Sequence, residues 1–216
     1  MTTALIARTA PTVRPPWLVA ADLSAILLLA VEGGLMAVAA GLGPFGVLVV
    51  AFVSSLGGGL IRDLIVQRHP PAAFGSILYP ATALVGGMVA ALGHGVLDDL
   101  LLGVRAPFDA AALGLLCVVG AIIALDRGTS VLGAVVLGTV SAIGGGVIRD
   151  LLTGTVPLAL RHDVSAVAAA AGAAATVIAL RCRAPRSVAA VLGVVVCASL
   201  SMVATAQGWR LPALGG

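Results

Sequence analysis

Two Arg-Asp pairs, Arg62-Asp63 and Arg149-Asp150, are the residues of this sequence best suited to chemistry in an apolar setting. Each pair follows three consecutive glycines after a gap of two residues. The glycines are Gly57, Gly58 and Gly59 in the first copy and Gly144, Gly145 and Gly146 in the second. Both pairs lie inside apolar stretches, where a charged side chain is costly unless it is paired or hydrated. These four side chains are therefore expected to face a protein interior or water.

The partners and the role of each arginine are open to two interpretations. Neighbouring residues of a helix point about 100 degrees apart, so Arg62 and Asp63 are expected to be poor partners for each other. Each arginine should instead pair with another helix, and Glu32 offers one carboxylate. The pairs either fasten the helices together or line, gate or select along a polar path. Because a fixed arginine repels cations unless it is neutralised, gating or packing is favoured over binding.

The triple glycines weaken the two helices that contain them. A helix with three glycines can bend, unwind or let another helix come very close. If it opens, its free carbonyls face the gap with partial negative charge and suit a partly dehydrated cation. The alternative is a close helix crossing without a pore, but the duplication with Arg-Asp favours the polar path. Ser54 and Ser141, one turn before each triple, either offer hydroxyls to that path or bond to their own helix.

The composition restricts the chain to the membrane and excludes several functions. Of 216 residues, 60% are hydrophobic and only 10% are charged, whereas soluble domains are about 25% charged. The net charge of +3 does not predict nucleic-acid binding, because no basic run is interleaved with aromatic residues. The three cysteines form no CxxC pair, so neither a metal nor a cofactor is expected. An enzyme is also disfavoured, because no nucleophile, base and orienting group cluster.

Seven apolar spans, each long enough to cross a bilayer, make up most of the chain. They run over Trp17–Ala40, Pro44–Val66, Ser76–Leu97, Phe108–Leu125, Ser130–Leu152, Val164–Leu180 and Ser187–Ala206. An offset of 87 residues carries Ser54 onto Ser141 and Pro70 onto Pro157, so the first three spans repeat as the next three. Because each unit has an odd number of spans, the second is inverted in the membrane. Inverted repeats are typical of transporters and channels whose site lies where the halves meet.

The resulting fold class is an all-α integral membrane protein of seven transmembrane helices, arranged as an inverted 3+3 repeat plus one. Four segments are predicted: a disordered lead over 1–16, a first repeat over 17–97, an inverted second repeat over 104–181, and a seventh helix over 186–207. Within the repeats, Asp22 and the equivalent Asp109 are expected to be helix caps more than ion ligands. Glu32 is a candidate for attracting cations, and Val119 stands at its equivalent position.

Two copies of Gly-Gly-Gly-x-x-Arg-Asp followed by proline resemble the prokaryotic members of the TRIC family of trimeric intracellular cation channels. The resemblance spans residues 18 to 205 and is strongest at Ser54–Pro70 and Ser141–Pro157. It implies a homotrimer with an hourglass pore in each protomer, formed around second and fifth helices kinked at the triple glycines. It also implies permeation of monovalent cations, chiefly K+ or else Na+, with lipid as a further bound component. Gln67 stands where the second copy has Gly154, so the turn before Pro70 is expected to differ.

Two functions are consistent with these features of the sequence. A passive cation channel is the first hypothesis, and a secondary transporter of a small solute such as glycine is the alternative.

The protein is expected in the cell (inner) membrane. More arginines lie on the N-terminal face than on the opposite one, and this excess places the N-terminus in the cytoplasm. The N-terminal face has Arg8, Arg14, Arg68, Arg127, Arg181, Arg183 and Arg186, and the opposite face has Arg105, Arg161 and Arg210.

Overall fold

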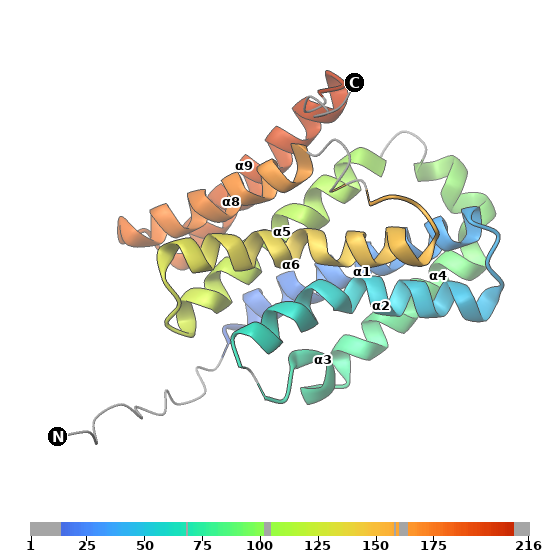
Figure 1. Cartoon of the computed structure of the whole chain (residues 1–216), viewed down its shortest axis with the longest axis horizontal. Helices are drawn as coiled ribbons and strands as arrows, with labels where there is room; N and C mark the ends of the chain where they lie inside the picture. Colours follow the sequence, from blue (N-terminus) through green and yellow to red (C-terminus); the bar gives the residue numbers. More distant parts are fainter. Residues whose placement is uncertain (1–13, 68, 102–104, 158, 160–163, 210–216) are drawn as a thin grey trace.

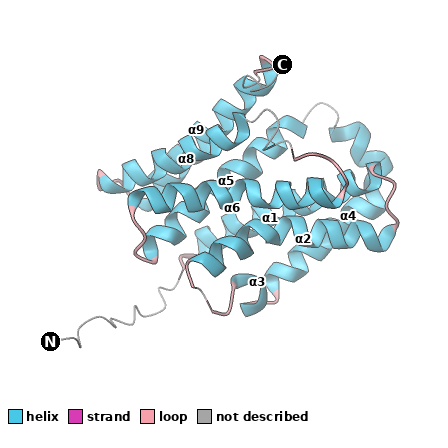
Figure 2. Cartoon of the chain, viewed as in Figure 1, coloured by secondary structure: helices cyan, strands magenta, loops and turns pink. Residues whose placement is uncertain are grey.

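The structure is a computed structural model that describes residues 14–67, 69–101, 105–157, 159 and 164–209. This part of the chain is helical and holds no strand (Figure 2). Its helices are α1 (Pro16–Ala39), α2 (Pro44–Ile65), α3 (Ala72–Gly75), α4 (Leu78–Leu101), α5 (Arg105–Asp126), α6 (Val131–Leu152), α8 (Val164–Arg181) and α9 (Arg186–Ala206). The all-α prediction is confirmed.

Seven of these helices are long and apolar enough to cross a membrane. The spans are Pro16–Ala39, Pro44–Ile65, Leu78–Leu97, Ala106–Asp126, Val131–Leu152, Val164–Arg181 and Arg186–Ala206. They agree with the predicted spans to within two residues at every end. The protein is therefore a multi-pass membrane protein. The short helix α3 between α2 and α4 was not predicted, and it packs against both.

Local sequence explains where the main helices begin. Pro16 and Pro44 occupy first helical positions, where proline's fixed φ suits the helix and its missing N–H is not needed. Ser130 caps α6, because its hydroxyl oxygen accepts a hydrogen bond from the backbone N–H of Gly133 at 3.1 Å. Of the predicted lead, residues 1–13 lie outside the described residues, whereas Arg14 is ordered and makes tertiary contacts.

Helix α5 forms the centre of the bundle. Within its most apolar stretch 72% of the residues are buried, compared with 22% for α4 at the periphery. Its buried residues Leu116, Val119 and Ile122 belong to the main hydrophobic core. Helix α5 packs against α1, α6, α8 and α9, and the last two helices also pack against each other (Figure 1). The seventh span, α9, is thereby attached to the second repeat.

The two glycine-containing helices, α2 and α6, pack directly against each other and bring the repeats together. Both are α-helical throughout, including their triple glycines. The exposed carbonyls of an opened helix are thus not present in this conformation. The contact between α2 and α6 corresponds to the alternative interpretation, a close helix crossing.

Candidate functional site

The crossing of α2 and α6 depends on the middle glycine of each triple. A β-carbon on Gly58 would collide with the carbonyl oxygen of Ser141, and one on Gly145 would collide with the carbonyl oxygen of Ser54. A β-carbon on Gly144 would lie 3.3 Å from the Cα of Gly58. The backbones therefore touch with no side chain between them, as close-packed membrane helices do at small residues. The repeat makes Gly58 equivalent to Gly145 and Ser54 equivalent to Ser141, so each contact is the counterpart of the other. The crossing therefore has approximate twofold symmetry.

Both arginines reach back toward this crossing. A β-carbon on Gly59 would lie 3.6 Å from Nη2 of Arg62, and one on Gly146 would lie 3.8 Å from Nη2 of Arg149. Each guanidinium therefore lies over the third glycine of its own triple. This is the direction in which helical side chains lean, toward the N-terminus of their own helix.

The first charged cluster is built around Arg62, whose side chain is only 1% exposed. Its Nε donates a hydrogen bond to Oδ1 of Asp63 at 2.9 Å, and its Nη1 lies 3.7 Å from Oδ1 of Asp22 on α1. The prediction that neighbouring Arg and Asp are poor partners was wrong. The long arginine side chain curls back alongside its own helix, so that its Nε comes within reach of the next carboxylate. The expected partner on another helix is also present, as Asp22.

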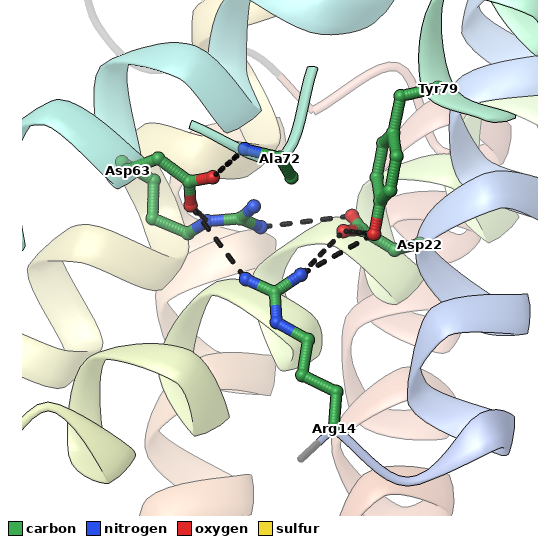
Figure 3. Close-up of polar contacts among 6 residues, drawn as sticks. Arg14, Asp22, Asp63, Ala72 and Tyr79 are labelled. Carbon is green, nitrogen blue, oxygen red and sulfur yellow. Dashed lines mark hydrogen bonds and ion pairs between the residues drawn. The ribbon is translucent and has the colours of Figure 1, made fainter. Parts of the chain in front are cut away.

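Arg14 and Tyr79 complete this first cluster (Figure 3). Nη1 of Arg14 lies 3.4 Å from both Oδ2 of Asp22 and the hydroxyl of Tyr79, and Nη2 lies 3.9 Å from Oδ1 of Asp63. The Tyr79 hydroxyl donates to Asp22 at 3.2 Å. Oδ2 of Asp63 accepts from the backbone N–H of Ala72 at 2.8 Å, which ties the end of α2 to α3. Two arginines and two aspartates thus form one buried network.

The second charged cluster is built around Arg149. Its Nε donates to Oδ1 of Asp150 at 2.9 Å, which repeats the geometry of the first copy. Its Nη1 donates to Oε1 of Glu32 on α1, with a distance of 2.5 Å. Glu32, predicted to be an available carboxylate for one of the two arginines, is thus the partner of Arg149 on another helix. Asp109 lies near this cluster and lines the same cavity as Arg149 and Asp150.

Each charged cluster lines a cavity, and the repeat relates the two cavities. The first, of about 270 Å³ including its mouth, is lined by Asp22, Ser55, Gly59, Arg62 and Asp63 among others. The second, of about 500 Å³ including its mouth, is lined by the equivalent residues Asp109, Ala142, Gly146, Arg149 and Asp150. Leu116 of the second repeat lines the first cavity, and its equivalent Leu29 of the first repeat lines the second. Each repeat therefore contributes one wall to the other's cavity.

Ser54 and Ser141 lie at the crossing but differ in their bonding. The Ser54 hydroxyl donates to the carbonyl of Ala51 at 3.3 Å, the bond to its own helix that serines in membranes often make. The Ser141 hydroxyl is fully buried and has no hydrogen-bond partner among the residues that the structure describes. It is a polar group held in the most tightly packed part of the site.

The structure corrects the prediction for the early aspartates and adds residues that the sequence did not single out. Asp22 and Asp109 lie inside α1 and α5, past the first turn, so they are not caps. Tyr79 was overlooked, although it is the sole tyrosine of the sequence and lies within a predicted span. Arg14 was assigned to the lead. In the described part of the chain no group of three His, Cys, Asp or Glu side chains could hold a metal ion.

Comparisons with known proteins match both repeats. A family model described as glycine transporter matches residues 19–95 and again 106–181, and the starts of the two matches are 87 residues apart, as in the internal repeat. A membrane protein of Deinococcus radiodurans, UPF0126, is 38% identical over 156 residues, which cover 71% of this chain and 72% of the relative. The inner membrane protein YadS of Escherichia coli, also of UPF0126, is 32% identical over 161 residues, covering 70% and 73% of the two chains.

Solved structures share the fold. A structure described as a TRIC trimeric intracellular cation channel orthologue from Rhodobacter sphaeroides is 28% identical with a TM-score of 0.84, and 90% of this chain covers 100% of that one. A structure on conductance through TRIC cation channels is 32% identical with a TM-score of 0.79, and 90% of this chain covers 95% of that one. With both repeats matched by the glycine-transporter model and this fold shared along nearly its whole length, the chain belongs to the TRIC family.

Proposed function

We propose that the protein is a passive channel for monovalent cations, chiefly K+ and also Na+, with one hourglass pore in each protomer of a homotrimer. The observation that carries this proposal is the pair of cavities, one beside each charged cluster and related by the repeat, together with the close crossing of α2 and α6. Two vestibules separated by a narrow waist have the form of an hourglass. In this proposal the waist lies where Gly58 meets Ser141 and Gly145 meets Ser54.

The charges of the two clusters support cations over anions. Arg62 and Arg149 are each held by carboxylates, so neither presents an unneutralised positive charge to the path. Asp22 and Asp63 line the first cavity, and Asp109 and Asp150 line the second. Because carboxylates match the charges of the arginines, the two cavities are without the excess positive potential that would repel cations.

The crossing of α2 and α6 acts as the gate in this proposal. With the glycines in contact, the two cavities share none of their lining residues. A small separation of the two helices would join the cavities and free the carbonyl oxygens of Ser54 and Ser141 for a cation. Both oxygens lie at the contact, so they are the first polar groups that a widening crossing would uncover.

Single-channel recording tests the proposal. The purified full chain, in a planar bilayer with a KCl gradient, should give unitary currents that reverse near the potassium equilibrium potential. Replacing K+ by Na+ should leave a current, whereas replacing it by N-methylglucamine should abolish it. Absence of unitary currents at any voltage, in protein shown to be folded and inserted, would contradict a channel.

A second candidate function, carriage of glycine, is favoured by the description of the matching family model. It predicts uptake of labelled glycine into proteoliposomes that saturates and is accelerated by glycine on the opposite side. A channel predicts neither saturation nor counterflow. Measuring glycine counterflow and potassium current on the same preparation separates the two functions.

The homotrimer and the orientation are tested separately. Light scattering on detergent-solubilised protein, with the detergent contribution subtracted, should give three times the 21.2 kDa chain mass. The similar structure from Rhodobacter sphaeroides is described as a trimeric channel orthologue.

The protein is proposed to lie in the inner membrane of the cell, with its N-terminus facing the cytoplasm. Alkaline phosphatase fused to the C-terminus should then be active in the periplasm, because an odd number of spans places the two ends on opposite faces.

A further inference from the structure

Tyr79 lies where two cavities meet on the N-terminal side of the bundle. The inner cavity is the first of the two already described, and it reaches Gly59, next to the crossing of α2 and α6. The outer cavity, of about 1260 Å³ including its open mouth, is lined by Arg14, Tyr79, Asp126 and Arg127 among others. Tyr79 and Ala72 line both cavities, so the boundary between the two cavities runs past these side chains.

The ring of Tyr79 is the larger of these two side chains, and it is packed in an apolar cluster at the boundary. The cluster joins Tyr79 on α4 to Ile26 on α1 and Leu56 on α2. Ile26 and Leu56 also line the inner cavity. Tyr79 itself is only 6% exposed. An apolar ring packed in this way is a barrier to a hydrated cation, because hydrophobic constrictions exclude water.

The hydroxyl of Tyr79 fixes the position of this ring. It donates a hydrogen bond to Oδ2 of Asp22 on α1 at 3.2 Å and accepts one from Nη1 of Arg14 at 3.4 Å (Figure 3). The Asp22 side chain is only 2% exposed, so little water competes for its carboxylate. The bond to Asp22 therefore ties the start of α4 to α1 and holds the ring across the boundary.

The second repeat has no ring at the equivalent position. The offset of 87 residues places Ala166 at the position of Tyr79 and Ala142 at the position of Ser55. Ser55 lines the inner cavity, and Ala142 lines the equivalent cavity of the second cluster. That second cavity is the larger of the two, at about 500 Å³ compared with about 270 Å³. The two cavities thus allow a comparison with and without the tyrosine.

We propose that Tyr79 is a gate at the N-terminal entrance, in series with the crossing of α2 and α6. The ring is the barrier, and the hydrogen bond from the hydroxyl to Asp22 is the latch. The proposal rests on the proposed channel function, in which K+ enters through the outer cavity. When the bond breaks, rotation of the ring about its Cα–Cβ bond joins the outer cavity to the inner one. Because Ala166 replaces the tyrosine in the second repeat, this gate acts at one entrance only.

Chemical access to the inner cavity is the first test, and it requires no ion current. A Cys182→Ser background removes the exposed native thiol and leaves Cys117 and Cys197, which are buried. In that background, purified full-length protein with Ser55→Cys is treated with methyl methanethiosulfonate, a small thiol reagent. Mass spectrometry of the peptide that contains residue 55 measures the rate of modification.

The rate at residue 55 should depend on residue 79. It should be about tenfold higher in Tyr79→Phe than with the native tyrosine, the factor that corresponds to losing one hydrogen bond to a charged group. It should be higher again in Tyr79→Ala, which loses the ring as well as the latch. An unchanged rate in both variants would overturn the gate.

Ala142→Cys is the matched control for this reaction, because residue 142 has the equivalent place in the second cavity. Its rate of modification should be the same whether residue 79 is tyrosine, phenylalanine or alanine. An equal acceleration at residues 55 and 142 would mean that the changes at Tyr79 loosen the whole bundle, and it would overturn the gate.

Potassium current in planar bilayers is the second test. Tyr79→Phe should raise the open probability by about tenfold over the wild type, for the same loss of one hydrogen bond. Phe74→Ala is the control, since Phe74 lies on the neighbouring helix α3 and is 72% exposed, and its currents should remain those of the wild type. In protein that conducts, equal currents in wild type and Tyr79→Phe would overturn the gate, and so would an equal rise in Phe74→Ala.

The two measurements separate failure of the gate from failure of the channel. If no variant conducts but residue 55 reacts faster in Tyr79→Phe, the channel fails and Tyr79 still controls access to the inner cavity. If currents occur and residue 55 reacts at one rate with all three residues at position 79, the channel stands and the gate is overturned.

Discussion

Arg149 on α6 donates a hydrogen bond to Glu32 on α1, with 2.5 Å between Nη1 and Oε1, and this contact joins the two repeats. In the first repeat the equivalent arginine, Arg62, pairs with Asp22 of its own repeat. Glu32 has no counterpart, because Val119 stands at its equivalent position. One of the two charged clusters is therefore internal to a repeat, and the other links the repeats.

Glu32→Gln should loosen the contact between α1 and α6. The change leaves a neutral partner for a largely buried guanidinium, whose side chain is 8% exposed while that of Glu32 is 30% exposed. We expect a loss of about 1–2 kcal/mol of stability, the value of a hydrogen bond between charged groups at partial exposure. Thermal unfolding in detergent measures it. Asp126→Asn, which breaks a more exposed pair with Arg186, is the control and should cost less than about 0.5 kcal/mol; equal losses would contradict this account.

Gly58→Ala and Gly145→Ala should force α2 and α6 apart. Each added methyl would collide with a backbone carbonyl oxygen, that of Ser141 or Ser54, which cannot move aside as a side chain can. We expect a loss of about 1–3 kcal/mol for each, the usual cost of overpacking. Potassium currents should change as well, because these residues form the waist of the proposed pore.

The third glycine of each triple provides a matched control for these variants. A methyl on Gly59 would lie 3.6 Å from Nη2 of Arg62 and one on Gly146 would lie 3.8 Å from Nη2 of Arg149, which are ordinary van der Waals contacts. Gly59→Ala and Gly146→Ala should thus be neutral or slightly stabilising, since alanine favours a helix by about 0.5–1 kcal/mol over glycine. If all four variants melted alike, the close crossing would not be what the middle glycines provide.

The helices and the repeat could be predicted from the sequence because both are encoded locally. An uninterrupted apolar stretch specifies a span by its length, and the offset between Ser54 and Ser141 is visible without any structure. The sequence also indicates that Glu32 is an available carboxylate for a buried arginine, although it does not tell which of the two arginines pairs with it. Few carboxylates lie within the spans, and a buried arginine requires one.

The contacts that were missed depend on side-chain conformation and on segments outside the repeat. The side chains of Arg62 and Asp63 leave the helix in different directions. The arginine side chain is nevertheless long enough to bend back and donate a hydrogen bond to the aspartate. The prediction that Asp22 is a cap rests on its place near a span start, whereas its partners Arg14 and Tyr79 come from the N-terminal segment and from another helix. Nothing in the spacing of these residues indicates that the chain brings them together.

Ser141→Ala should stabilise the protein. The Ser141 hydroxyl is 0% exposed and without a partner among the described residues, so its removal relieves the cost of burying an unpaired polar group. We expect a gain of about 1 kcal/mol. Ser54→Ala instead loses a hydrogen bond to Ala51 and should cost about 0.5 kcal/mol. Comparison of the two melting temperatures is the measurement, and a loss in Ser141→Ala as large as that in Ser54→Ala would show that the hydroxyl is satisfied.

Gln67 and Gly154 end their helices in the same backbone conformation, although the turns differ further on, where the His69–Pro70 peptide bond is cis and no cis bond precedes Pro157. Their φ angles are 52° and 72°, in the left-handed region that costs a non-glycine residue about 1 kcal/mol. Gln67→Gly should therefore stabilise the first turn by about 0.5–1 kcal/mol. Gly154→Ala should destabilise the second by about 1 kcal/mol, although a β-carbon there meets no atom within 4 Å. Opposite shifts in melting temperature support a purely conformational effect, whereas shifts of the same sign would mean that side-chain contacts control these turns.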